Sequence, residues 1–122
     1  MYAYNAITKR EYRAGPASTL RVIGQQTASG DSATALASGT AKHPRALYVR
    51  VRATPSQRVS VSWSMTCSKG LGAGSRSGDF TAYTPVTRRM PFPTRKPDSC
   101  SVSATAQLDD SGTIKVALLV PR

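Results

Sequence analysis

Apolar and polar residues alternate along most of the chain after residue 16, and the alternation is clearest in four segments. A period of two places one set of side chains in a core and the other set in water, which is the pattern of a half-buried β-strand. The four segments are 46–54, 58–67, 99–108 and 113–120. Three segments with weaker alternation are also expected to be strands, and these are 19–25, 32–41 and 80–86.

About seven short strands separated by turn residues predict an all-β fold, an antiparallel β-sandwich. No window carries the apolar stripe of an amphipathic helix, so almost no helix is expected. The 122 residues suit one domain. Residues 1–16 mix charges with tyrosines and end in Gly15-Pro16. They are expected to form a flexible N-terminal arm that precedes a sandwich domain from 17 to 122.

Four segments between these strands carry turn or loop residues. Residues 54–57 (TPSQ) and 109–112 (DDSG) are short enough for tight hairpins. The glycine-rich segment 69–78, KGLGAGSRSG, is expected to be a flexible loop. The segment 85–97 contains four prolines, which cannot donate to a central ladder. It is therefore expected along a sheet edge or as a crossing between sheets.

The two cysteines, Cys67 and Cys100, stand at the ends of strand-like segments. An even count without a CxxC pair gives no zinc or redox signature. A disulfide is favoured over two buried free thiols. It would close a loop of 33 residues and stabilise the fold by roughly 3–4 kcal/mol. A structural disulfide indicates an oxidising compartment. Trp63 alternates in phase with Val61 and Met65, so it is expected in the core rather than as a platform for a sugar.

The net charge is +11, from 17 Lys and Arg residues against 6 Asp and Glu residues. Such a surface attracts anionic partners, although the same charge can serve solubility alone. Tyr48, Arg50 and Arg52 alternate outward on one expected strand, and Arg58 follows just past the turn. Guanidinium groups bind phosphate, sulfate or carboxylate in a bidentate manner.

These four residues are the expected anion-binding surface. The alternative is a solvated strand face whose arginines oppose aggregation. A second basic cluster, with the same two interpretations, comprises Arg88, Arg89, Arg95 and Lys96.

The residue pattern gives little support for a catalytic function. The single histidine, His43, lies beside a proline in a turn-like segment, and the Asp109-Asp110 pair shares a turn. The glycine-rich segment matches neither a P-loop nor a dinucleotide-binding motif, and it contains no nucleophile elbow. No catalytic residue, metal site or cofactor is expected.

Three stretches of the C-terminal half resemble small exported proteins of actinobacteria. They are YVRVRATPSQRVSVSWSMTCSKG, TPVTRRMPFP and PDSCSVSATAQLDDSGTIKVALL. Proteins of this group are one-domain β proteins with a single cysteine pair, and the resemblance covers roughly residues 45–120. It implies export and a Cys67–Cys100 bridge, and it carries over no site residue.

The sequence thus predicts a non-enzymatic secreted or cell-wall-associated protein that contacts anionic polymers or surfaces. Two alternatives stay open: a subunit of an extracellular or viral-type particle, and a nucleic-acid-binding module. No apolar stretch approaches the ~18 residues of a membrane span. Residues 1–16 lack the apolar core of a signal segment, so no such segment is expected in this chain. The sequence alone sets no oligomeric state.

Overall fold

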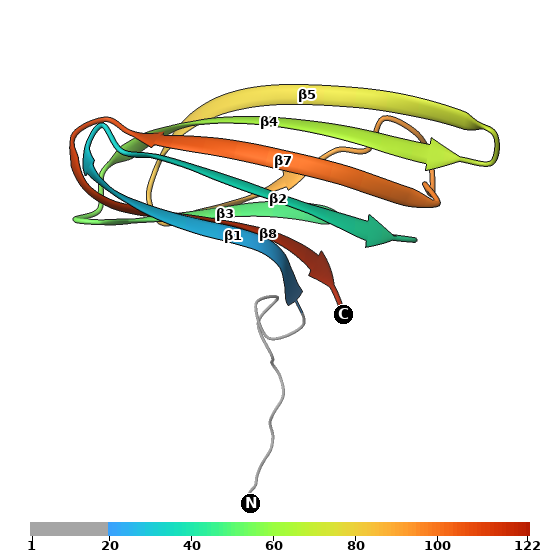
Figure 1. Cartoon of the computed structure of the whole chain (residues 1–122), viewed down its shortest axis with the longest axis horizontal. Coiled ribbons are helices and arrows are strands. Elements are labelled where there is room, and N and C mark those ends of the chain that lie inside the picture. Colours follow the sequence, from blue (N-terminus) through green and yellow to red (C-terminus); the bar gives the residue numbers. More distant parts are fainter. Residues whose placement is uncertain (1–19) are drawn as a thin grey trace, which may run out of the picture.

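The computed structural model describes residues 20–122, which form eight β-strands in two layers (Figure 1). The expected all-β antiparallel sandwich is confirmed, with eight strands rather than about seven, and residues 20–122 contain no helix. The expected arm, 1–16, lies outside the described residues. The strands are β1 (Leu20–Asp31), β2 (Thr34–Lys42), β3 (Leu47–Thr54), β4 (Arg58–Lys69), β5 (Gly72–Tyr83), β6 (Val86–Met90), β7 (Ser99–Leu108) and β8 (Ser111–Pro121).

The two sheets have a simple pairing rule. The first sheet has the order β1-β8-β3-β6, and the second sheet has the order β2-β7-β4-β5. Strand β1 therefore pairs with β8, β2 with β7, β3 with β6 and β4 with β5, all antiparallel. This is one long hairpin rolled up so that its successive strand pairs alternate between the two sheets, which is the arrangement of an eight-stranded jelly roll.

The core lies between the sheets and is made of the side chains that alternate inward. Val49 and Val51 on β3 and Val59 and Val61 on β4 are almost completely buried. Trp63 belongs to the same core, as the alternation predicted, with 9% of its surface exposed. Its indole lies against Gly78 on β5, where an added Cβ would come within 2.8 Å of the Trp63 Cζ2 atom.

Cys67 on β4 and Cys100 on β7 are register partners and form a disulfide, with Cα atoms 4.1 Å apart. Both cysteines are buried in the core. The bridge therefore ties two neighbouring strands of the second sheet, and it confirms the pairing that the resemblance implied.

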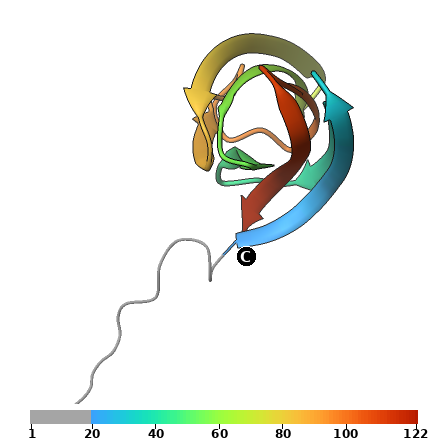
Figure 2. The same cartoon turned by 90° about the vertical axis from the view of Figure 1, so that its left-hand side faces the viewer.

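The sandwich is nearly closed along the flank where β1 lies beside β2, as the end-on view shows (Figure 2). A Cβ added at Gly24 would come within 2.0 Å of the Ser38 carbonyl oxygen, and one added at Gly39 would come within 2.6 Å of the Ile23 carbonyl oxygen. The two glycines thus permit a close backbone approach. On the opposite flank, the Arg88 guanidinium on β6 lies over the Phe80 ring on β5, 4.3 Å from the ring centroid.

The two expected hairpins are wrong. Residues 54–57 lead from β3 in the first sheet to β4 in the second, and residues 109–110 lead from β7 in the second sheet to β8 in the first. Both are arches between sheets, because the rolled topology separates these sequence neighbours. The Gln57 side chain ties the two arches together. Its Nε2 donates to the Ser111 carbonyl oxygen at 2.9 Å, and its Oε1 accepts from the Asp110 backbone N–H at 2.8 Å.

The expected glycine-rich loop is also wrong, because residues 72–78 belong to β5. Only Gly70 and Leu71 form the turn, and Gly70 has a positive φ of 58°. The segment forms an edge strand that is paired only to β4, and its glycines leave room for neighbouring side chains such as Trp63. In the proline-rich segment, residues 86–90 form the edge strand β6, and residues 91–98 cross between the sheets.

Candidate functional site

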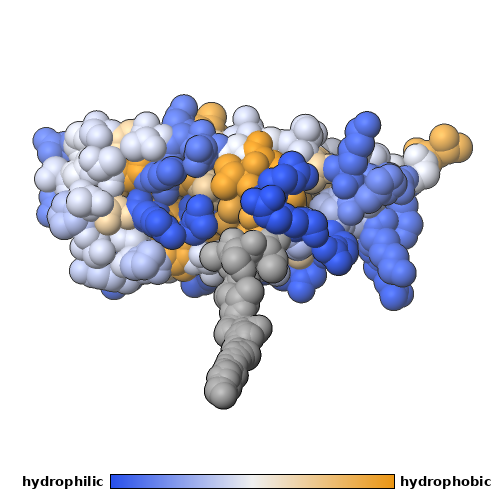
Figure 3. Space-filling model, turned by 90° about the horizontal axis from the view of Figure 1, so that it is seen from below, coloured by the Kyte–Doolittle hydropathy of each residue, from blue (hydrophilic) through white to orange (hydrophobic). Residues whose placement is uncertain are grey.

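The outer face of the first sheet carries a hollow of about 440 Å³, here called the outer hollow. Strand β3 supplies its central side chains, because the alternation that buries Val49 and Val51 turns the residues between them outward. Figure 3 looks onto this face and shows long hydrophilic side chains around a hydrophobic centre. The lining residues are Leu20, Tyr48, Arg50, Arg52, Thr87, Arg89 and Leu119.

The strand register explains why these side chains meet. Tyr48 lies opposite Arg89 on β6 and Leu119 on β8, and Arg50 lies opposite Thr87 on β6. Side chains on one face recur about 7 Å apart along a strand, and neighbouring strands are about 4.8 Å apart. The outer hollow thus combines three guanidinium groups and one phenol around apolar side chains, and none of the lining residues within the described part of the chain is acidic.

The structure brings together three of the four residues expected to bind anions. Tyr48 and Arg50 are half-buried and Arg52 is exposed, and all three line the outer hollow. Arg58 is elsewhere, because it begins β4 of the second sheet and faces outward beside the buried Val59. Arg58 was expected beside Arg52 because the two are close in the sequence. Residues 54–57 instead cross to the other sheet and separate them. Arg89 supplies the third cation of the outer hollow in place of Arg58.

The second basic cluster of the sequence separates into three places. Arg89 points to the outer face, whereas Arg88 lies opposite the buried Val49 and covers Phe80. Arg95 and Lys96 lie in the crossing between β6 and β7 and line a second hollow of about 500 Å³ at the end of the sandwich, here called the end hollow. The residues around it are His43, Pro44, Arg45, Arg89, Phe92, Arg95, Lys96 and Pro97. Arg89 lines both hollows.

The outer face of the second sheet is a lattice of hydroxyl groups that the sequence expectations did not treat as a surface. Two complete rows cross its four strands, Thr40–Ser101–Thr66–Ser75 and Ser38–Ser103–Ser64–Ser77. Some neighbours are hydrogen-bonded, such as Ser64 and Ser103, whose hydroxyl oxygens are 3.2 Å apart. The alternating serines and threonines in 60–66 and 101–105 could have indicated this hydroxyl face from the sequence. The rows across the strands can be recognised only when the register is known.

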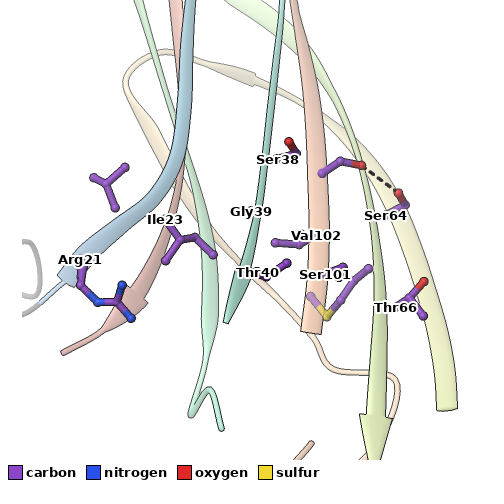
Figure 4. A pocket seen from close by; sticks show the side chains of 12 residues that line it. Arg21, Ile23, Ser38, Gly39, Thr40, Ser64, Thr66, Ser101 and Val102 are labelled. Atoms are coloured by element: carbon purple, nitrogen blue, oxygen red, sulfur yellow. Dashed lines mark hydrogen bonds between the residues drawn. The ribbon is translucent and has the colours of Figure 1, made fainter. Parts of the chain in front are cut away.

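A third hollow, of about 700 Å³, lies where this hydroxyl face meets β1 (Figure 4). It is lined by Ser38, Thr40, Ser64, Thr66, Ser101 and Ser103, and Arg21 is the single charged residue that residues 20–122 contribute to it. Hydroxyl groups offer both donors and acceptors to a neutral polar ligand. The low charge makes this hollow a weaker place for a polyanion than the outer hollow.

Among residues 20–122, no three His, Cys, Asp or Glu side chains gather in a way that could hold a metal ion. His43 lies in the end hollow without a carboxylate among the residues that line it. No helix in the part of the chain that the structure describes is long and apolar enough to cross a membrane.

Comparison with solved structures gives a distant likeness in fold. No protein-family model matches the chain, and no curated protein matches it. Among solved structures, TmCBM61 in complex with beta-1,4-galactotriose resembles the chain with a TM-score of 0.46 and 10% sequence identity. The alignment covers 90% of this chain and 98% of that chain.

Proposed function

We propose that the protein is a non-enzymatic binding module that contacts anionic polymers or surfaces through the outer hollow. The observation that carries the proposal is the meeting of Arg50, Arg52 and Arg89 beside Tyr48 in a hollow that no acidic residue among 20–122 lines. Such an arrangement gives the first sheet a locally concentrated positive potential, which raises both the encounter rate and the affinity for polyanions.

A polymer suits this site better than a single small anion. Arg50 and Arg52 are spaced along β3, and Arg89 lies on the neighbouring strand. Their side chains therefore extend from separate points of the sheet around one hollow. Repeated anionic groups along a chain can engage several such cations at once, and each contact adds to the salt dependence of binding.

The disulfide supports a secreted or cell-wall-associated location, because structural disulfides persist mainly in oxidising compartments. This agrees with the resemblance of residues 45–120 to small exported actinobacterial β proteins. Nucleic acid is the less favoured polyanion. Sequence-tolerant binding of single strands uses successive aromatic platforms, and among residues 20–122 Tyr48 is the only aromatic residue that lines the outer hollow.

Heparin-affinity chromatography tests the proposal with two matched double variants. Arg50→Gln with Arg52→Gln removes two cations of the outer hollow. Lys42→Gln with Arg58→Gln removes two exposed cations from the second sheet and keeps the same net charge. The first variant is expected to elute at clearly lower salt than the second. Equal shifts would mean that the charge acts only in bulk.

A second candidate function, a subunit of an extracellular or viral-type particle, is favoured by the strand order. Eight-stranded jelly rolls form viral capsid domains as well as lectin domains, and the fold alone does not decide between them. Sedimentation velocity over a wide concentration range separates the two. A binding module stays at its own small size, whereas an assembly subunit forms large species.

A further inference from the structure

The end hollow differs from the outer hollow in that two inter-sheet crossings frame it. Residues 43–46 join β2 to β3, and residues 91–98 join β6 to β7. The His43 backbone N–H donates to the Asp98 carbonyl oxygen at 2.7 Å, which joins the two crossings. Cationic side chains from both crossings therefore face one depression.

The floor of the end hollow is apolar and rigid. Pro44 and Pro97 are buried, and Phe92 is half-buried against the core. The rings of the prolines fix their own φ angles. Because little conformational freedom remains, a ligand that binds here orders few groups, and this favours affinity.

Two residues at the rim have unusual backbone conformations. His43 has a φ of 48° and Lys96 has a φ of 44°. Residues other than glycine rarely adopt positive φ, and such positions tend to occur at functional sites. Among residues 20–122, Ser32 is the other non-glycine residue with this conformation, and it lies in the turn between β1 and β2.

The carboxylate nearest in sequence to these cations is hydrogen-bonded to the backbone of the turn between β4 and β5. The Oδ2 atom of Asp98 accepts a hydrogen bond from the Gly70 backbone N–H at 2.6 Å, at the turn between β4 and β5. The Lys69 ammonium group donates to the Arg95 carbonyl oxygen at 2.5 Å and so helps to hold that crossing. Arg45 donates to the Arg122 carbonyl oxygen at 2.8 Å. Of the residues between 20 and 122 that line the end hollow, none is acidic.

We propose that the end hollow is a separate binding site for a small phosphate ester whose organic part is flat and apolar. The phosphate group would accept hydrogen bonds from Arg89, Arg95 and Lys96 at the rim, and the organic part would lie on Phe92 and the two prolines. Charge-assisted hydrogen bonds of guanidinium to phosphate are among the strongest in proteins. The site shares only Arg89 with the outer hollow, so it does not depend on polymer binding there.

Isothermal titration calorimetry at low ionic strength tests the inference with phenyl phosphate and with inorganic phosphate. Phenyl phosphate is expected to bind with one-to-one stoichiometry and more tightly than inorganic phosphate, because only the ester places a ring on the apolar floor. The absence of a saturable signal with phenyl phosphate, or equal affinity for both probes, would overturn the proposal.

Two variants localise the site. Arg95→Gln with Lys96→Gln is expected to weaken phenyl phosphate about tenfold or more, whereas Arg50→Gln with Arg52→Gln should change it less than about twofold. Equal weakening in both variants would show that general charge, not the end hollow, attracts the ester. If the first variant does not fold, Arg89→Gln replaces it and is expected to weaken both phenyl phosphate and heparin.

Discussion

Tyr48 on β3 stands directly opposite Arg89 on β6, and both side chains line the outer hollow. The pair joins residues 41 positions apart in the chain (from 48 to 89) through one rung of the β3–β6 ladder. Cross-strand neighbours of this kind have Cβ atoms about 5 Å apart. The register between β3 and β6 therefore brings these residues of the outer hollow together.

Removal of the Cys67–Cys100 bridge is expected to lower the free energy of unfolding by roughly 3–4 kcal/mol. The bridge ties β4 to β7 in the core, so its loss frees the unfolded chain more than it alters folded contacts. Denaturant unfolding with and without reductant measures the change. Alkylation without reductant, followed by mass spectrometry, is the control, and labelled cysteines in the native protein would contradict the disulfide.

Gly78→Ala is expected to destabilise the protein by about 1–3 kcal/mol, because its Cβ would lie 2.8 Å from Trp63 Cζ2 in a packed core. Gly72→Ala on the same strand is the matched control, since its nearest contact is an ordinary 3.5 Å to the Lys69 carbonyl oxygen. Thermal unfolding followed by tryptophan fluorescence compares them. A similar melting temperature for both variants would contradict the placement of the indole against β5.

Gln57→Ala is expected to cost about 1–3 kcal/mol, because it removes side-chain hydrogen bonds to both Asp110 and Ser111. Gln25→Ala, at an exposed position of β1, should change stability by no more than about 0.5 kcal/mol. Urea unfolding of the two variants measures the difference. The role of Gln57 as the tie between the two arches is wrong if the variants unfold at the same urea concentration.

The sequence predicts the strongly alternating strands well because their buried positions carry apolar residues in strict alternation with polar ones. Expected segments 58–67 and 99–108 match β4 (Arg58–Lys69) and β7 (Ser99–Leu108) closely. Strand β5 was missed over residues 72–78, since an edge strand that makes room for Trp63 carries glycine and serine, which also form loops. Residue periodicity describes one strand at a time and contains no information on which strands pair.

The candidate site shows the same limit. Alternation correctly turned Tyr48, Arg50 and Arg52 to one face, because Val49 and Val51 are buried between them. The prediction that Arg58 lies beside them because it is close in sequence was wrong, since the arch of residues 54–57 places Arg58 in the other sheet. Proximity in sequence failed also for Arg88 and Arg89, since neighbours on a strand face opposite sides. Arg89 joins the site only through its pairing with Tyr48.

The salt dependence of heparin binding tests the central claim most directly, because its slope reports the number of cations that engage the polymer. Titrations between low and moderate salt are compared for the wild type, for Arg50→Gln with Arg52→Gln, and for Lys42→Gln with Arg58→Gln. If the outer hollow holds the polymer, the slope of log Kd against log salt falls by about two in the first variant and stays nearly unchanged in the second. An equal fall in both variants would contradict the account.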